Sequence, residues 1–269
     1  MDIISAEKIL KAVKAPSFYD IKVLDEAVST STLLKELGEN GAPEGTVVIA
    51  ERQTGGRGRL GRSFFSPEAA GIYMSLLVRP EITLSECTQI TALAAVSVCD
   101  AIKDVTGITT GIKWVNDVYR DGKKVSGILT EASLSDDNCT PKFISVGIGV
   151  NVYQSDMPRE IADVATSLFT ENPEEIRNEL IAKILDIFYG YYISEIAVNA
   201  NKKDFIEKYK KYSVVTGRQI KVIRGSESFE AEALGIDDDC SLLVRLQNGQ
   251  TLSLSSGEIS IRPLDGKGL

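Results

Sequence analysis

The sequence predicts an α+β protein, with a β-sheet flanked by helices followed by a small antiparallel β-barrel. Two styles of sequence support this prediction, and they divide near residue 212. Before that point, strand-like apolar runs alternate with helical periodicities. After it, short alternating runs are separated by turn residues, a pattern typical of antiparallel strands. We therefore expect a large domain over residues 1–212 and a small domain over residues 213–269.

Four apolar runs of the first part predict the strands of the sheet, at residues 46–51, 71–78, 124–133 and 143–152. Helical spacing covers residues 32–38 and 85–105. A third helix is expected from Pro173 onward, because Asn172 can cap its first turn and proline is favoured there. Its apolar residues repeat on one face, which indicates a buried face rather than a cofactor site. A further helix at residues 202–211 leads into the second part.

Four short segments of the second part predict its strands, at residues 218–225, 228–237, 241–256 and 257–263. Within the third segment, Asn248 and Gly249 lie between two alternating runs. An Asn-Gly pair in that setting predicts a β-hairpin. The strands are short enough for a small barrel.

Charge and composition exclude several classes of chemistry. The chain has 30 basic and 38 acidic residues and a formal net charge of −8, which opposes non-specific attraction to nucleic acid. It has no histidine, so Ser-His-Asp and Cys-His catalysis and imidazole-bound metals are excluded. The four cysteines show no CxxC spacing, and we expect them to be buried free thiols. The chemistry must rest on lysine, arginine, carboxylates and backbone amides.

The chain also lacks the features of a membrane or secreted protein. None of its apolar runs approaches the roughly 20 residues that a transmembrane helix needs. Its N-terminus, MDIISAEKIL, carries early acidic residues and no basic segment before an apolar block, unlike a signal peptide. We expect a cytoplasmic protein that does not bind a membrane.

The most informative segment is the glycine-rich loop, ERQTGGRGRLGRSFFSP, at residues 51–67. Eleven of its residues, 52–62, include four glycines and four arginines, in an otherwise acidic protein. Glycine lets the backbone approach a ligand closely, and arginine supplies planar donors for phosphate or carboxylate. The segment therefore predicts a loop that wraps an anion.

The same loop contains a GxGxxG match at Gly56, Gly58 and Gly61, which is a weak indication of dinucleotide binding. That motif needs a helix to begin at the glycines, so that its N-terminus faces the pyrophosphate. Here the glycines are followed by SFFSP and then by a strand-like run, and no Gly-Lys-Ser/Thr closes a Walker A loop. We do not expect a Rossmann or P-loop site.

A second cluster of polar residues lies in Lys113–Asp117 and around Lys124. A turn at Asp121-Gly122 would join two strands here and bring polar side chains from both to one place. Asp117 and Lys124 are the candidates to face a ligand. From the residues alone they could equally form a surface ion pair, and Trp114 could be a core residue.

Five motifs together resemble the biotin protein ligase family. They are GRGRLGR at residues 56–62, KWVNDV at 113–118, KVSGIL at 124–129, VGIGVNV at 146–152 and SGEISIR at 256–262. They follow the order seen in that family, and the resemblance spans residues 20–263. It implies a mixed sheet in a catalytic domain similar to class II aminoacyl-tRNA synthetases, and a C-terminal barrel similar to Src-homology-3 domains.

The resemblance implies a two-step reaction. Biotin and ATP, with Mg²⁺, form biotinoyl-5′-AMP, and biotin then passes to a lysine of a biotin carboxyl carrier protein domain of biotin-dependent carboxylases. Because the biotin carboxylate and the triphosphate repel each other, arginine, lysine and Mg²⁺ are needed to neutralise and orient them. The lack of histidine is compatible with this, since positioning and electrostatics can do most of the work.

The resemblance also implies roles for individual residues. The biotin-binding residues would be Ser29, Thr30, Ser31, Gln53, Arg57, Gly58, Arg59, Lys124 and Gly127. The residues that bind ATP and the adenylate would be Arg59, Arg62, Phe64, Asn116, Asp117, Lys124, Asn151, Glu258 and Arg262. The catalytic residues would be Lys124, Arg59 and Asp117. Metal ligands are not assigned.

Within these sets, Lys124 would bridge the biotin carboxylate and the α-phosphate, and Asp117 would orient the incoming amine. Three positions depart from the family pattern: Ser31 replaces asparagine, Phe64 replaces tryptophan and Val115 replaces proline. Because a mixed anhydride hydrolyses readily, the glycine-rich loop is expected to be mobile without ligand and ordered over the intermediate.

Alternatives remain at this stage. A lipoate or octanoyl ligase shares the general fold, but its Arg-Arg pair before consecutive glycines is absent here. A non-catalytic binding protein could retain the pocket. Some biotin ligases carry a DNA-binding domain, and the residues before Ile21 are too few for one, so we expect no DNA binding. A homodimer is possible.

Overall fold

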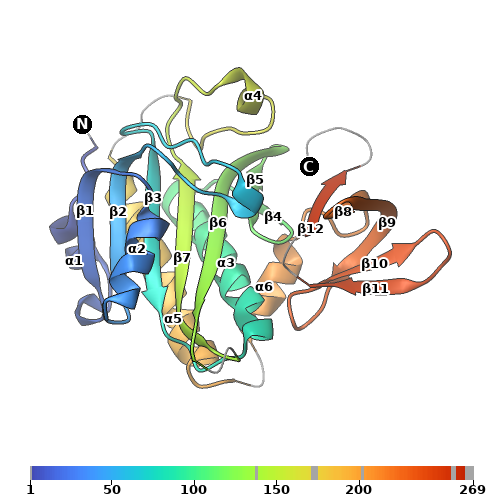
Figure 1. The fold of residues 1–269 in the computed structure, drawn as a ribbon. Helices are drawn as coiled ribbons and strands as arrows, with labels where there is room; N and C mark the ends of the chain where they lie inside the picture. Colours follow the sequence, from blue (N-terminus) through green and yellow to red (C-terminus); the bar gives the residue numbers. More distant parts are fainter. Residues whose placement is uncertain (1, 137–138, 171–174, 201–202, 256–258, 264–269) are drawn as a thin grey trace.

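The computed structural model describes residues 2–136, 139–170, 175–200, 203–255 and the backbone of residues 259–263. Its elements form two sheets, and the helices pack around the first of them, as Figure 1 shows. Among the described residues, no helix is both long enough and apolar enough to cross a membrane.

The first sheet has seven strands in the order β1-β2-β3-β7-β6-β5-β4 (Figure 1). Its strands are β1 (Asp20–Ala27), β2 (Thr46–Gln53), β3 (Gly71–Val78), β4 (Gly111–Lys113), β5 (Asp117–Arg120), β6 (Lys123–Leu134) and β7 (Pro141–Asn151). The pair β1 and β2 is parallel and the other neighbours are antiparallel. The prediction of a mixed sheet flanked by helices is confirmed, and the four predicted strands correspond to β2, β3, β6 and β7.

Helices cover both faces of this sheet. They are α1 (Ala6–Ala12), α2 (Thr30–Glu39), α3 (Cys87–Thr106), α4 (Arg159–Ala162), α5 (Arg177–Tyr191) and α6 (Asp204–Tyr212). The helix α2 packs alone on one face, where Leu34 meets Val48, Leu77 and Phe143 of the strands. The helices α3 and α5 pack together on the opposite face (Figure 1). This arrangement leaves the end of the sheet beyond α2 open to the loops.

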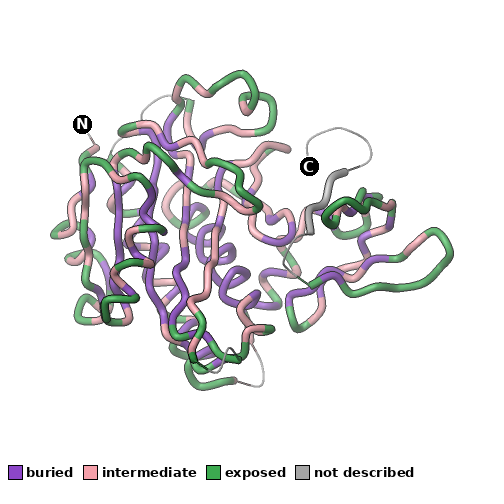
Figure 2. Tube along the Cα trace, in the orientation of Figure 1, coloured by how far each residue is buried: buried purple, intermediate pink, exposed green. Residues whose placement is uncertain are grey.

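The main core lies between the sheet and α3, as the buried segments in Figure 2 show. From Thr88 to Ile102, every residue of α3 is buried, including the small residues Ala94 and Ala95. A helix that is apolar nearly all round must be enclosed, and α3 is enclosed by β6, α5 and α6. The α3 helix therefore supports the strands β5 and β6 from behind.

The second sheet is antiparallel, with strands in the order β11-β10-β9-β8-β12. Its strands are β8 (Gln219–Arg224), β9 (Glu227–Ile236), β10 (Leu242–Leu246), β11 (Thr251–Leu254) and β12 (Ile259–Pro263). The predicted Asn-Gly turn joins β10 to β11, where Gly249 has φ +86° and its amide donates to the Leu246 carbonyl. The closure of this sheet into a barrel stays a prediction.

Three details differ from the sequence-based expectations. The helix α5 begins at Arg177, while Asn172 and Pro173 lie outside the described residues. The helix α1 has no counterpart among the predicted elements. All four cysteines are free thiols, and Cys99 and Cys240 are buried as expected. Cys87 is only half-buried, and Cys139 is exposed in the connection between β6 and β7, so the expectation that all four are buried is wrong.

Candidate active site

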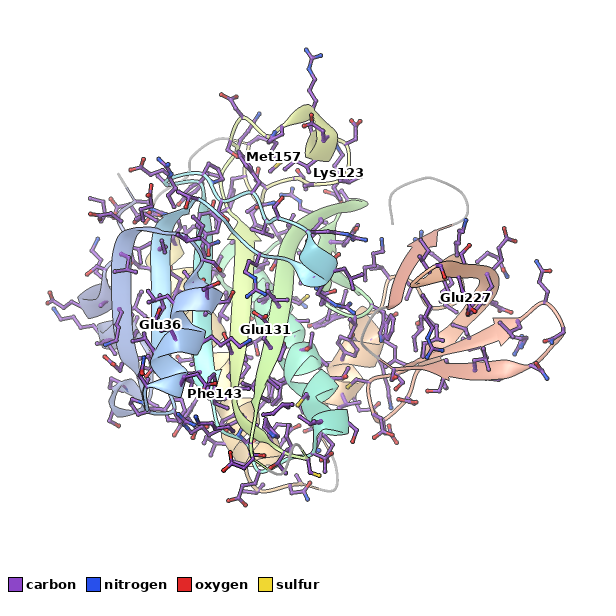
Figure 3. The ribbon with its side chains drawn as sticks, viewed as in Figure 1. Glu36, Lys123, Glu131, Phe143, Met157 and Glu227 are labelled. Carbon is purple, nitrogen blue, oxygen red and sulfur yellow. The ribbon has the colours of Figure 1, made fainter. Side chains whose placement is uncertain are left out.

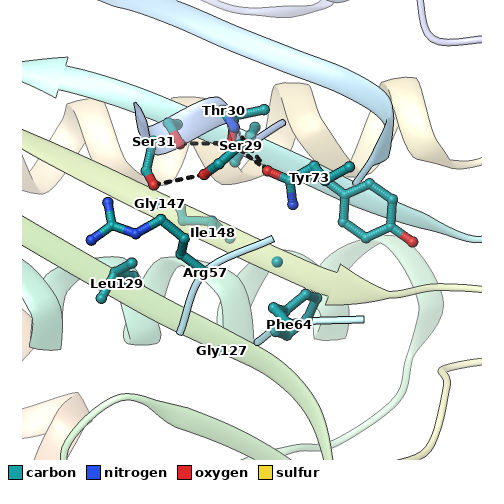
Figure 4. Close-up of a pocket in the computed structure, with 14 residues that line it drawn as sticks. Ser29, Thr30, Ser31, Arg57, Phe64, Tyr73, Gly127, Leu129, Gly147 and Ile148 are labelled. Atoms are coloured by element: carbon teal, nitrogen blue, oxygen red, sulfur yellow. Dashed lines mark hydrogen bonds between the residues drawn. The ribbon is translucent and has the colours of Figure 1, made fainter. Parts of the chain in front are cut away.

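A pocket lies on the face of the first sheet that carries α2, beneath the glycine-rich loop (Figure 4). It is lined by Ser29, Thr30, Ser31, Gln53, Arg57, Phe64, Tyr73, Met74, Ser75, Gly127, Leu129, Gly147, Ile148 and Gly149. The structure thus brings together seven residues predicted to bind biotin or the adenylate, from three separate segments of the chain.

The N-terminus of α2 supplies the polar end of this pocket. The backbone amide of Thr30 donates to Gln53 Oε1 at 2.8 Å, and Ser29 Oγ lies 3.0 Å from Ser31 Oγ. The hydroxyl of Thr30 also lies 2.9 Å from Ser75 Oγ on β3. The three α2 hydroxyls are buried. Because a hydroxyl can both donate and accept, this end of the pocket suits a ligand that carries donors and acceptors.

Gln53 connects this polar end, through hydrogen bonds, to the C-terminal part of the glycine-rich loop. Its Nε2 donates to Ser66 Oγ at 2.9 Å, and the Ser66 hydroxyl donates to the Phe64 carbonyl at 3.0 Å. A Cβ on Gly56 would lie 2.4 Å from that carbonyl oxygen, so only glycine fits there. Ser66 and Ser75 were not predicted as site residues, because isolated serines carry no motif.

Glycines of β6 and β7 form the floor of the pocket. Gly127 and Gly149 are cross-strand partners, and the Phe64 ring rests on them. A Cβ on Gly149 would lie 2.6 Å from the Phe64 ring, which shows how closely the ring approaches the sheet. Phe64 also makes an edge contact with Tyr73, with ring centroids 6.4 Å apart. Phe64, predicted for the adenylate, therefore lies among the residues predicted for biotin.

Lys124 lies next to Gly127, at the end of the pocket floor opposite the α2 hydroxyls. Its Nζ lies 2.6 Å from Asp117 Oδ1 and 5.8 Å from the centroid of the Phe64 ring. The two ion-pair side chains are 28% and 24% exposed, so they are partly shielded from water. A Cβ on Gly127 would lie 2.8 Å from the Lys124 Nζ, so glycine at 127 makes room for the lysine head group.

Arg59 reaches the same end from the loop. Its Nη1 lies 3.3 Å from Asn116 Oδ1, while Asn116 Nδ2 donates to the Ile128 carbonyl at 2.7 Å. Burial lowers the pKa of the Arg59 guanidinium from its ordinary value, and the Asp117 carboxylate opposes that shift. Arg59, Asn116, Asp117 and Lys124 form the group of residues that we call the cationic cluster.

One turn and two buried hydrogen bonds position the cationic cluster. The turn between β5 and β6 has positive φ at both Asp121 and Gly122, as the sequence predicted. Behind β4, Trp114 is buried and its Nε1 donates to the Cys240 carbonyl of the second sheet at 3.0 Å. The Tyr209 hydroxyl of α6 donates to the Val115 carbonyl at 2.7 Å. The cluster is therefore supported from both sheets, and Trp114 is a core residue.

Four predicted residues, Gly58, Arg62, Asn151 and Arg262, lie outside both the pocket lining and the cationic cluster. Arg62 is exposed, and its carbonyl accepts from the Gly58 amide at 2.7 Å. Asn151, at the end of β7, donates to the Thr166 carbonyl at 3.1 Å. Arg262 lies on β12 opposite Lys221, and only its backbone is described. A fifth predicted residue, Glu258, is outside the described residues.

Arg57 has a partner that the sequence did not reveal. Its Nη1 and Nη2 donate to the two carboxylate oxygens of Glu131 on β6, at 2.9 and 2.8 Å. Glu131 lies in the run that follows KVSGIL, and only the cross-strand arrangement brings it to the loop. The alternation of Gly147 and Gly149 in VGIGV, which places both on one face, could have been used to predict the pocket floor.

Taken together, the geometry suits an elongated acid. The polar end offers hydroxyls and an amide, the middle is floored by glycines and covered by an aromatic ring, and the other end holds two cations. Lysine and arginine at one point favour a carboxylate next to phosphate groups. No group of three or more His, Cys, Asp or Glu side chains suited to a metal occurs within the described parts of the chain.

Comparisons with known proteins agree with this geometry. The model of the Biotin/lipoate A/B protein ligase family matches residues 24–151, and that of the Biotin protein ligase C terminal domain matches residues 215–262. The Bifunctional ligase/repressor BirA of Bacillus spizizenii is 40% identical over 226 residues, which are 84% of this chain and 69% of that protein. The Biotin--[acetyl-CoA-carboxylase] ligase of Mycobacterium tuberculosis is 30% identical over 248 residues, 89% of this chain and 88% of that protein.

Among solved structures, the biotin protein ligase from Aquifex aeolicus in complex with biotin and ATP matches with a TM-score of 0.75 and 31% identity. The match covers 91% of this chain and 100% of that chain. The similarity therefore includes both sheets rather than the pocket alone. The sequence similarity and the fold together show that the chain belongs to the Biotin/lipoate A/B protein ligase family.

Proposed function

We propose that the chain is a biotin protein ligase, which activates biotin with ATP and transfers it to a lysine of a carrier protein. The observation that carries this proposal is the position of Lys124. Its Nζ lies where the glycine-floored pocket ends and the cationic cluster begins. An acid lying in the pocket would place its carboxylate there, next to the groups that would hold the α-phosphate.

In the first step, a biotin carboxylate oxygen attacks the α-phosphorus of ATP and pyrophosphate leaves. Lys124 and Arg59 would neutralise the negative charges of the carboxylate and of the phosphoryl oxygens, which repel each other as the two groups approach in the transition state. The ion pair with Asp117 would hold the Lys124 head group in place before the substrates arrive. Preorganised donors of this kind cost no reorganisation during the reaction.

In the second step, the amine of the acceptor lysine attacks the acyl carbon of biotinoyl-5′-AMP, and AMP leaves. We infer that Asp117 orients this amine and accepts its hydrogen bond, because it is the carboxylate of the cationic cluster. The acceptor is proposed to be a biotin carboxyl carrier protein domain of a biotin-dependent carboxylase.

Mg²⁺ would enter with ATP. Asn116 and Asp117 offer the amide and carboxylate oxygens that this hard cation accepts, but the described residues hold no cluster of acidic side chains for it. The donor set therefore fits a cation held mainly by phosphates and water. Its chemistry would be to neutralise the triphosphate.

The remaining assignments are proposals of the same kind. Arg62 would contact the ATP phosphates, Asn151 the ribose, and Glu258 and Arg262 the nucleotide from the C-terminal part. The division into a catalytic domain over residues 1–212 and a small domain over residues 213–269 is supported by the separation of the two sheets. The bond from Trp114 to Cys240 favours a role for the second sheet at the site.

The similarity of the catalytic domain to class II aminoacyl-tRNA synthetases and of the second sheet to Src-homology-3 barrels remains a prediction. Homodimerisation and the absence of DNA binding also remain predictions.

Pyrophosphate release provides the test of the proposed function. With ATP and Mg²⁺, we expect biotin to stimulate pyrophosphate release, whereas lipoate and octanoate in parallel reactions should not. The physical reason is the polar end of the pocket, where hydroxyls and an amide suit a ureido ring better than a dithiolane or an alkyl chain. Pyrophosphate release with lipoate alone would contradict the assignment of biotin as the substrate. Release with none of the three acids would indicate that the chain is a non-catalytic binding protein.

The glycine floor supports a second prediction. Replacing Gly149 with alanine is expected to raise the KM for biotin by about tenfold or more, because the new Cβ would displace the Phe64 ring from the sheet. Steady-state kinetics, with the biotin and ATP concentrations varied separately, would measure the KM for each substrate. Gly235→Ala on β9 is the matched control, since no atom lies within 4 Å of its Cβ position. Equal KM values for the two variants would contradict the prediction.

A further inference from the structure

The ion pair between Arg57 and Glu131 joins the glycine-rich loop to the sheet. Both terminal nitrogens of the Arg57 guanidinium, Nη1 and Nη2, donate to the Glu131 carboxylate, at 2.9 and 2.8 Å. Two parallel bonds restrict the orientation of the guanidinium as well as its distance. The Glu131 side chain is 19% exposed and the Arg57 side chain is 44% exposed, so the pair is shielded from water mainly on the Glu131 side.

Because Glu131 lies at the edge of the pocket, its contact with Arg57 spans the pocket opening. Gly127 and Leu129 line the pocket, and Glu131 is the next residue of β6 on the same face of the strand (Figure 3). Arg57 also lines the pocket, and Figure 4 shows its side chain between Ser31 and Leu129. The arginine side chain therefore spans from the loop to the sheet over the polar end.

The loop itself is built to move as one piece. Arg57 and Ser63 form an antiparallel bridge, and the Gly58 amide donates to the Arg62 carbonyl. Leu60 and Gly61, at the tip, both have positive φ, as in a tight hairpin turn. A hairpin of this kind can lift from the sheet only if the contact of Arg57 with Glu131 breaks.

We propose that Glu131 is a positioning residue that holds the glycine-rich loop closed through Arg57, and so determines how long an acyl-adenylate is retained. The proposal rests on the proposed function. An adenylate that meets water is lost, because water attacks the acyl carbon, the bond to the AMP oxygen breaks, and biotin and AMP separate. A closed loop excludes that water until the acceptor lysine arrives.

Release of the intermediate tests this proposal directly. Labelled biotinoyl-5′-AMP would be formed on the enzyme, and its release without acceptor would be followed after free ligand is removed. In Glu131→Gln, release is expected to be about five- to tenfold faster, because one charge of a partly shielded pair is lost. The rate of adenylate formation is expected to change by less than about twofold, because Glu131 does not contact the cationic cluster.

Two further arms separate this role from a general loss of structure. Raising the ionic strength should speed release more in the wild type than in Glu131→Gln, since only the wild type has the Arg57–Glu131 charges to screen. The exchanged pair Arg57→Glu/Glu131→Arg should release the adenylate more slowly than Arg57→Glu alone. Glu36→Gln, an exposed glutamate of α2 (Figure 3), is the matched control and should behave as the wild type. Equal release from Glu131→Gln and Glu36→Gln would overturn the proposal.

Limited proteolysis tests the contact without any substrate. Trypsin can cut the loop after Arg57, Arg59 and Arg62. Mass spectrometry should show faster cleavage there in Glu131→Gln than in the wild type and Glu36→Gln. If the wild type forms no adenylate, the proposed function fails, but faster cleavage would still support the role of Glu131 in closing the loop. Equal cleavage in all three proteins would overturn that role.

Discussion

Replacing Lys124 with alanine is expected to lower biotin-dependent pyrophosphate release by about 10²- to 10³-fold, the usual cost of removing a donor aimed at developing charge. The lysine head group lies at the junction of the pocket and the cationic cluster, 2.6 Å from Asp117. Its removal would leave the biotin carboxylate and the α-phosphate to repel each other. Single-turnover formation of the adenylate would report this loss, because it excludes the transfer step.

The neighbouring Lys123 is the matched control. Its Nζ donates to the Ala162 carbonyl at 2.9 Å, away from the pocket, so Lys123→Ala should retain nearly full activity. Because Lys124→Ala also leaves Asp117 without its partner, the double variant Lys124→Ala/Asp117→Asn should be measured as well. If the double variant recovered activity, the loss would come from the exposed carboxylate rather than from the missing cation.

Replacing Arg177 with methionine is expected to lower the free energy of unfolding by about 3–5 kcal/mol, the cost of removing one partner from a buried ion pair. The Arg177 side chain, on α5, is 1% exposed. Its Nη1 lies 2.7 Å from Glu51 Oε2, and its Nε lies 3.3 Å from Asp2 Oδ2. Methionine fills much of the same volume but would leave both carboxylates buried and unpaired.

Urea denaturation of the wild type and of Arg177→Met would measure this loss in the free energy of unfolding. Arg52→Met is the matched control, because Arg52 pairs with Glu26 on β1 at 3.1 Å with both side chains about half exposed. Such surface pairs are worth about 0–1 kcal/mol. Glu51 precedes Arg52 and Gln53 on β2, so Arg177→Met should also weaken biotin binding through Gln53. A loss in Arg177→Met no larger than in Arg52→Met would contradict the prediction.

Much of the architecture could be predicted because it depends on local patterns. The strand β3 has the predicted bounds, since a run of apolar residues ends at Pro80 on one side and begins at a glycine on the other. The turns at Gly122 and Gly249 were predicted because positive φ needs particular residue types. The glycine-rich loop was predicted as an anion site because its composition is unusual within an acidic chain.

Other features had no local pattern to reveal them. The helix α1 is short, and its burial depends on packing against α5 and β1. The Ser75 and Ser66 hydroxyls are ordinary serines until strands and loop bring them to Thr30 and Gln53. Glu131 is one of 38 acidic residues, and its partner lies 74 positions away along the chain.

The sequence by itself determined the class of chemistry: no histidine, a loop rich in arginine and glycine, and a lysine next to a tight hairpin. These features are carried by residue type and short spacing, so they can be read without coordinates. Only the tertiary structure decided which side chains meet. Cross-strand register placed Gly127 beside Gly149, and the path of the loop placed Phe64 on them and Arg57 on Glu131. Such contacts depend on how distant segments pack, which no local pattern encodes.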